Sequence, residues 1–140
     1  MTRPADQKTS IERTRHLRRA LVANAWFSGA SGLALLFGAG PVAAWMGVSS
    51  AALLRGLGLA LALFAAGLAW IARSEPLPRS LAVGATLSDV AWVVGSAVLV
   101  LGFPEVLTEA GRWTVVLVAV VVAALGGAQA AGLRRTRPST

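Results

Sequence analysis

The chain of 140 residues has no cysteine, no tyrosine and one histidine, His16. The absence of cysteine excludes disulfides, thiolate nucleophiles, iron–sulfur clusters and thiolate zinc sites. A single histidine cannot form a bis-histidine haem site within one chain. We therefore expect no cofactor and no metal. Nucleophile–base pairs also need a base, and His16 lies outside the apolar stretches, so we predict that the protein is not an enzyme.

Charge is scarce as well. Only 14% of the residues are charged and 56% are hydrophobic, whereas an ordinary soluble domain has about 25% charged residues. A soluble domain of this length leaves much of its surface exposed whatever its fold, so it could not hide so many apolar side chains. The high hydrophobicity also excludes a disordered chain. The composition therefore predicts a small integral membrane protein with one domain.

Four apolar stretches are long enough to cross a membrane, since about 20 residues span its hydrocarbon core. We predict an all-α bundle of four transmembrane helices within residues 17–133, flanked by basic cytoplasmic segments at 1–16 and 134–140. The first span is expected to end at Gly38–Pro41, so that no proline lies inside any span to kink it. The predicted spans are 17–37, 51–72, 80–102 and 112–133.

The basic residues predict the orientation of these spans. Eleven of the 13 lysines and arginines lie in the N-terminal segment, the middle loop or the C-terminal tail. An even number of spans puts both termini on one side, and the positive-inside rule makes that side the cytoplasm. The net charge of +7 is thus explained by the bilayer. Because neither end has a nucleic-acid-binding motif, we expect no nucleic-acid partner.

Three tryptophans, Trp45, Trp70 and Trp113, lie near the predicted span ends. Amphipathic aromatic rings favour the membrane–water interface, so we interpret these residues first as anchors. A different interpretation makes the first span a signal peptide cleaved after Val42–Ala44. Its apolar run exceeds the roughly 7–15 residues of such peptides, which favours a transmembrane span.

The two halves of the chain also resemble each other. Ala25–Gly29 matches Ala91–Gly95 at an offset of 66, and Ala65–Leu68 matches Ala130–Leu133 at an offset of 65. A duplication would give two parallel helical hairpins related by an axis along the membrane normal. A chain rich in alanine, glycine and leucine also matches itself by chance, so both interpretations stay open.

Small residues recur at helical spacing in every span, and small residues let helices pack closely in membranes. This pattern predicts tight packing within the bundle and docking on a second copy or a larger membrane partner. The stripes are Ser28 and Gly32; Gly58, Ala62 and Ala66; Gly84, Ser88, Ala91 and Gly95; and Ala119, Ala123, Gly126 and Ala130.

Polar residues inside the predicted spans are the candidate functional residues, because ionisable groups at membrane depth are costly. Asp89 lies about 13 Å along its helix from Ser80, near the bilayer midplane. Asn24 and Gln129 share the inner half of the membrane. Side chains tilt towards the N-terminus of their helix, so Asp89 and Gln129 lean towards each other. We predict an Asp89–Gln129–Asn24 hydrogen-bonded cluster.

Arg55 is a second candidate. It lies about 12 Å nearer the outside than Asp89, and its side chain is expected to snorkel to the outer surface. We therefore do not expect an Arg55–Asp89 ion pair.

Several segments resemble a group of uncharacterised small four-helix membrane proteins of bacteria. They are Asn24–Leu33, Leu54–Gly58, Ser88–Ser96 and Gln129–Arg135. Together they extend over most of the chain. The resemblance implies a location in the bacterial inner membrane, and it implies neither an activity nor roles for single residues.

Two functions fit these observations. The first is an accessory or structural subunit without catalytic activity, which docks other membrane helices and needs no cavity. The alternative is a small oligomeric proton-coupled carrier that uses the Asp89 cluster, since carboxyls at midplane form proton relays in transporters. The cluster would otherwise only bond the helices together. The sequence favours the accessory subunit.

Overall fold

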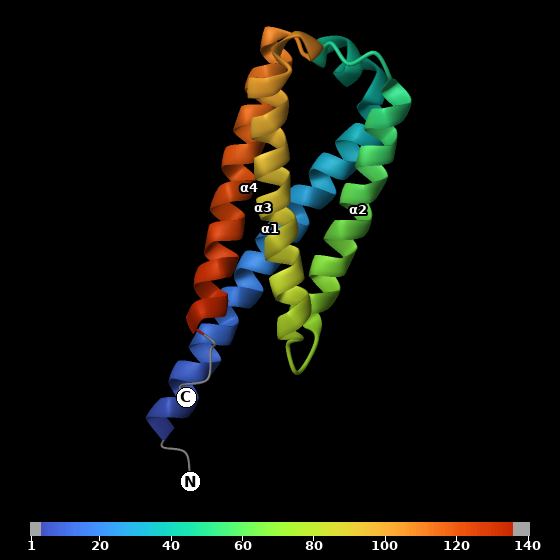
Figure 1. The fold of residues 1–140 in the computed structure, drawn as a ribbon. Helices are drawn as coiled ribbons and strands as arrows, with labels where there is room; N and C mark the ends of the chain where they lie inside the picture. Colours follow the sequence, from blue (N-terminus) through green and yellow to red (C-terminus); the bar gives the residue numbers. More distant parts are fainter. Residues whose placement is uncertain (1–3, 136–140) are drawn as a thin grey trace.

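Four long α-helices make up nearly all of residues 4–135, the part of the chain that the structure, a computed structural model, describes (Figure 1). The helices are α1 (Pro4–Met46), α2 (Ala51–Arg73), α3 (Arg79–Gly102) and α4 (Glu109–Arg135), with a short 3-10 turn, η1 (Pro104–Val106), between α3 and α4. All four are long and apolar enough to cross a membrane, as in a multi-pass membrane protein. The predicted all-α, four-helix fold is confirmed.

The bounds of α2 and α3 lie within one residue of the predicted spans, and α4 begins three residues before and ends two residues after its predicted span. Helix α1 begins at Pro4, before the predicted start at residue 17, and it also ends later than predicted. Its predicted end at Phe37 is wrong, and so is the expectation of a proline-free span, because α1 continues through Pro41 to Met46. Ala39 and Ala43, one turn apart, are buried against Leu54 of α2. This packing continues the helix past a Gly-Pro signal that would end an isolated one, as neighbouring helices allow in membranes.

Helices α1 and α2 form a hairpin that crosses at two glycines. A Cβ atom on Gly32 would lie 2.7 Å from the carbonyl oxygen of Gly58, and a Cβ on Gly58 would lie 2.7 Å from that of Gly32. Both obstacles are backbone atoms, which cannot move aside as a side chain can. The hairpin therefore depends on glycine at both positions, in the manner of small-residue interfaces in membranes.

The second hairpin, α3–α4, packs on the first chiefly through α1 and α4, and α2 and α3 have few contacts with each other. The start of α1, the end of α4 and the α2–α3 connection lie at one end of the molecule (Figure 1). We call this the basic end, and the opposite one the loop end. The arginines of the basic end within residues 14–135 are Arg15, Arg18, Arg19, Arg73, Arg79, Arg134 and Arg135.

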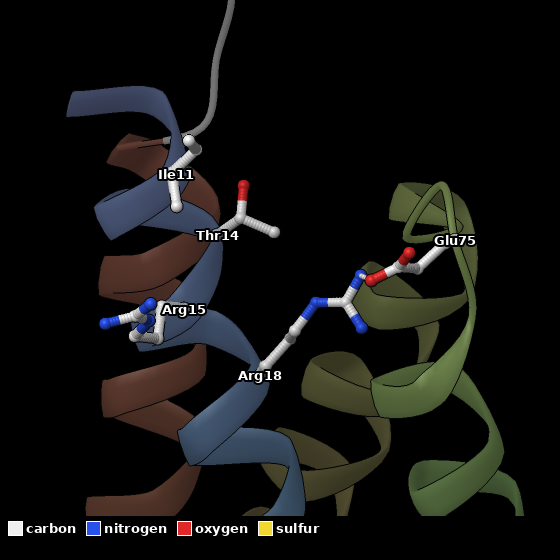
Figure 2. Close-up of a pocket in the computed structure, with 5 residues that line it drawn as sticks. All are labelled: Ile11, Thr14, Arg15, Arg18 and Glu75. Carbon is white, nitrogen blue, oxygen red and sulfur yellow. Dashed lines mark ion pairs between the residues drawn. The ribbon is translucent and has the colours of Figure 1, made fainter. Parts of the chain in front are cut away.

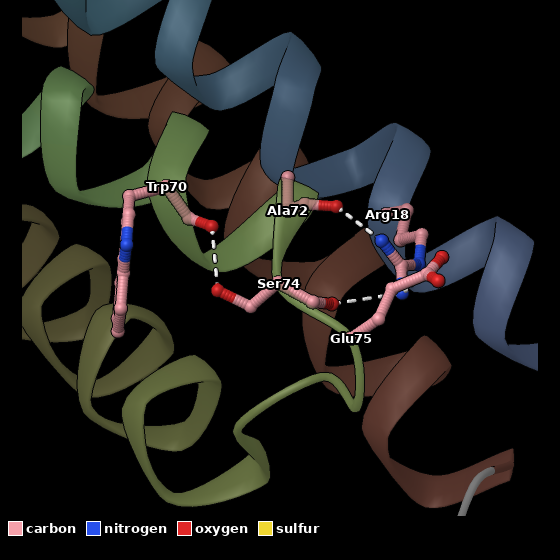
Figure 3. Close-up of polar contacts among 5 residues, drawn as sticks. All are labelled: Arg18, Trp70, Ala72, Ser74 and Glu75. Carbon is pink, nitrogen blue, oxygen red and sulfur yellow. Dashed lines mark hydrogen bonds and ion pairs between the residues drawn. The ribbon is translucent and has the colours of Figure 1, made fainter.

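At the basic end, one arginine caps the C-terminal end of the second helix of each hairpin, α2 or α4. Arg18 donates hydrogen bonds of 2.6 and 2.9 Å to the carbonyl oxygens of Ala72, in the last turn of α2, and Ser74, just after it (Figure 3). Arg79 donates one of 3.0 Å to the carbonyl oxygen of Leu133 in α4. The last carbonyls of a helix lack partners within it and attract cations. Both arginines therefore stabilise helix ends, besides contributing to the positive charge of this end.

Arg18 also forms a 3.4 Å ion pair with Glu75, across a hollow of about 320 Å³ between α1 and the α2–α3 connection (Figure 2). Arg15, one turn from Ile11, points to a different side of α1 from Arg18 (Figure 2). The two charged groups that face each other across this hollow are thus already paired. We regard this pair as part of the α2 cap.

The two hairpins are held together at both ends of the molecule. At the basic end, leucines of α1, α2 and α4 meet in a buried cluster that includes Leu17, Leu68 and Leu133. At the loop end, Thr108 donates a backbone hydrogen bond of 3.0 Å to Met46 and a hydroxyl hydrogen bond of 2.6 Å to Trp45. Between these two connections the hairpins meet in the middle of the bundle, where the predicted polar residues lie.

The glycine crossing gives a stability prediction. We expect Gly58→Ala to lower the free energy of unfolding by about 1–3 kcal/mol, the usual cost of overpacking. Gly56→Ala, two residues away, is the control, because a Cβ there meets no atom within 4 Å. It should be neutral or stabilising, since alanine favours helix over glycine. Unfolding in mixed micelles, followed by circular dichroism during an SDS titration, measures both; equal stability of the two variants would contradict the crossing.

Candidate functional site

Three helices contribute a polar side chain to one buried cluster. Asn24 of α1 donates a 2.7 Å hydrogen bond from Nδ2 to Oδ2 of Asp89 on α3. Gln129 of α4 donates a 2.8 Å hydrogen bond from Nε2 to the same oxygen. Asp89 is 4% exposed, and Asn24 and Gln129 are 0% exposed. The structure thus brings together the three residues that the sequence singled out, and one carboxylate oxygen receives both amide donors.

Two hydroxyl residues lie beside the oxygens of these amides. Ser28 donates a 3.1 Å hydrogen bond to Oδ1 of Asn24. The Thr86 hydroxyl donates its one hydrogen over 3.0 Å to the carbonyl oxygen of Ala82, and it lies 3.4 Å from Oε1 of Gln129. With its oxygen engaged, the Asn24 amide turns its NH₂ group towards Asp89. Sequence reasoning missed both hydroxyls. Their spacing could have indicated that they lie near the cluster, since Ser28 is one helical turn from Asn24 and Thr86 is one helical turn from Asp89.

A small residue lets α4 approach the carboxyl. A Cβ atom on Gly126 would lie 3.2 Å from Cβ of Asp89, closer than most real Cβ contacts. Gly126 lies one turn before Gln129 on α4, so the same close approach brings the Gln129 amide within reach of Asp89. The small-residue stripe predicted in the fourth span therefore positions the cluster as well as packing the helices.

Asp89 also lines a cavity of about 200 Å³ to which all four helices contribute. Phe27 and Ser31 of α1 and Phe64 of α2 face it, together with Trp92, which follows Asp89 by one turn on α3. Nε1 of Trp92 is buried and has no hydrogen-bond partner among the described residues. Because both amide donors bind Oδ2, Oδ1 of Asp89 accepts no hydrogen bond from the described residues.

Asp89 thus has an unused acceptor beside an apolar cavity, and Trp92, one helical turn away in the cavity wall, has a buried N–H without a partner. Buried polar groups normally have partners, so each exception needs an explanation. An apolar cavity with a few convergent polar groups is the usual form of a small-molecule site. Sequence reasoning missed Trp92 as a cavity residue, since it entered only as part of the segments Ala91–Gly95 and Ser88–Ser96. The i, i+3 spacing from Asp89 could have indicated it.

The other candidates lie apart from the cluster. Arg55 is exposed on α2 and forms no hydrogen bond or ion pair with the described residues, so the structure does not bring it to Asp89. Trp45, Trp70 and Trp113 are all exposed near helix ends, where anchors would lie. Among the residues whose side chains the structure describes, no three His, Asp or Glu side chains gather as a metal site would require.

Comparisons of the chain with protein-family models, curated proteins and solved structures found no match. The function is therefore inferred from the geometry of the cluster and the cavity.

The cluster predicts a loss of stability when its acceptor is removed. Asp89→Ala leaves the buried amides of Asn24 and Gln129 without their acceptor, so we expect a loss of about 1–3 kcal/mol in the free energy of unfolding. Asp89→Asn keeps an acceptor oxygen and should lose less. Ser88→Ala, on an exposed neighbour, is the control and should lose little. The same SDS titration measures all three; an Asp89→Ala variant as stable as Ser88→Ala would show that the cluster does not hold the helices.

Proposed function

We propose that the protein is a small non-enzymatic carrier that couples movement of a small solute to movement of a proton through Asp89. One observation supports this proposal above the others. A carboxyl buried between three helices lines a cavity between the two hairpins, with one of its oxygens held by amides and the other unused. The sequence favoured an accessory subunit because that function needs no cavity. The cavity beside Asp89 reverses this preference.

The hydrogen bonds suit a carrier's carboxyl. Asn24 and Gln129 are neutral, so they position Asp89 and leave its negative charge in place. An arginine or lysine in their place would neutralise that charge. The unused Oδ1 can take a proton or contact a solute, and the two occupants exclude each other. Such exclusion at one intramembrane carboxyl couples a solute to protons. The chemistry needs no nucleophile and no metal.

A carrier also has to open its site to each side in turn. The hairpins meet mainly along α1 and α4, and the few contacts between α2 and α3 leave those helices nearly free of each other. We propose that the hairpins rock about the α1–α4 contact, as structural repeats rock in larger transporters. The cluster lies at that contact, so its hydrogen bonds would report the movement.

The distribution of arginines and the resemblance to small bacterial membrane proteins support a proposed orientation and a proposed membrane for this protein. Among residues 14–135 the basic end has seven arginines, and the loop end has Arg112, with Arg55 one turn into α2. We therefore propose that the basic end, with both termini, faces the cytoplasm. The resemblance to small bacterial membrane proteins supports the inner membrane of a bacterium.

A different observation favours the accessory subunit as a second candidate. One face of α3, formed by Gly84, Ser88, Ala91 and Gly95, is exposed. A Cβ at either glycine would meet no atom within 4 Å. Such faces associate with other membrane helices. Native mass spectrometry from lipid nanodiscs separates the two candidates, because a stoichiometric larger partner supports the accessory subunit and a homodimer supports the carrier.

Proton movement tests the carrier directly. Proteoliposomes with a trapped pH dye would receive small organic solutes grouped as cationic, neutral or anionic. We expect one group to drive a pH change that protein-free liposomes lack. Asp89→Asn should slow this change about tenfold or more, because an amide cannot exchange a proton in its place.

Gly127→Ala is a matched control on α4, since a Cβ there meets no atom within 4 Å. It should transport like the unmodified protein. The carrier would be refuted if no group of solutes moved protons, or if Asp89→Asn moved them at the normal rate.

A further inference from the structure

The cavity wall has the composition of a cation site. Among the described residues that line it, Asp89 is the one charged residue, and none is basic. An anion would therefore meet a carboxyl with no compensating charge. Three aromatic side chains, Phe27, Phe64 and Trp92, line the same cavity. The faces of aromatic rings attract cations within about 6 Å, and more strongly where water is excluded.

A metal ion fits this wall poorly. Calcium takes about six to eight oxygen ligands and magnesium holds several waters. The wall offers one carboxyl and serine hydroxyls among leucines, valines and aromatic rings. An organic cation needs fewer polar contacts, because its alkyl groups lie against the apolar side chains. The cavity volume of about 200 Å³ limits the cation to a small one.

Two hydrogen-bonding groups of the wall define the rest of the occupant. The indole N–H of Trp92 has no partner among the described residues and is itself buried, so the ring has to turn to present it to an occupant of the cavity. The Ser31 hydroxyl makes no hydrogen bond with the described residues either. An N–H needs an acceptor, so the occupant should have an oxygen near its cationic nitrogen. Asp89 and Trp92 are one helical turn apart, which suits a linker of about two or three carbons.

We infer that this cavity binds a small organic cation with a hydroxyl or similar oxygen on a short alkyl chain. The nitrogen lies between Asp89 and the aromatic rings, and the oxygen accepts from Trp92. The inference depends on the proposed carrier function only for its consequence, since it names the solute class that would replace the proton on Asp89. Binding itself does not require transport.

Equilibrium binding of radiolabelled choline tests the inference. The full-length protein in lipid nanodiscs would be titrated in a scintillation proximity assay. We expect saturable binding of choline. Dimethylbutanol, its uncharged carbon isostere, should compete at least about tenfold less well, because it lacks the charge that Asp89 and the rings attract. Propyltrimethylammonium, which lacks the hydroxyl, should also compete less well.

Two variants assign these preferences to residues. Asp89→Asn should weaken choline binding about tenfold or more, because it removes the negative charge that attracts the quaternary ammonium group. Trp92→Phe keeps an aromatic ring and removes the N–H, so choline and propyltrimethylammonium should become nearly equal competitors. Trp70→Phe, which changes an exposed tryptophan outside the cavity, is the matched control and should keep the preference for choline.

The inference fails if the unmodified protein does not bind choline saturably, or if dimethylbutanol competes as well as choline. These comparisons need no variant, so they decide the question even if Asp89→Asn does not fold. The two proposals also fail separately. Choline binding without proton movement would refute the carrier and keep the site. Proton movement driven only by neutral or anionic solutes, without choline binding, would refute the cation site and keep the carrier.

Discussion

The structure depends on one carboxylate oxygen that accepts two amide hydrogen bonds inside the membrane. Oδ2 of Asp89 receives Asn24 from α1 and Gln129 from α4, so three helices are fixed relative to one another at one atom. A carboxyl at this depth is costly without partners. The partners are neutral, however, and they leave the second oxygen unused beside a cavity. Stability and proposed function therefore use different oxygens of one side chain.

The remaining contacts set the positions from which these amides reach Asp89. Gly32 and Gly58 bring α1 against α2, and Gly126 brings α4 against Asp89. Arg18 and Arg79 fix the basic ends of the two hairpins by binding helix carbonyls. Contacts between α2 and α3 are few, so the bundle is closed on the side of the cluster and loosely packed opposite it. Such uneven packing suits a molecule that opens around a fixed contact.

Sequence reasoning succeeded where membrane depth limits the choices. Polar residues are rare in the spans, and those at similar depth have few partners except one another, so Asn24, Asp89 and Gln129 could be grouped by depth alone. Sequence reasoning failed where the structure of a segment is set by packing against residues that are distant in the chain. Gly38–Pro41 is a local stop signal, but the burial of Ala39 and Ala43 against α2 extends α1 beyond it. From the sequence, Arg18 and Arg79 were counted only as charges that set the membrane orientation. Their role as helix caps was missed because the carbonyl groups that they bind lie more than 50 residues away in the chain. The cavity beside Trp92 likewise depends on four helices at once.

The most direct test is a solid-state NMR measurement of the cluster in lipid. Asn24 is the one asparagine in the chain, and aspartate and glutamine each occur twice, so labelling by residue type is nearly site-specific. A rotational-echo experiment would measure dipolar couplings from the side-chain nitrogens of Asn24 and Gln129 to the carboxyl carbon of Asp89. We predict that both nitrogens lie within hydrogen-bonding reach of that carboxyl. A carboxyl carbon coupled to neither amide, or to one alone, would contradict the three-helix cluster.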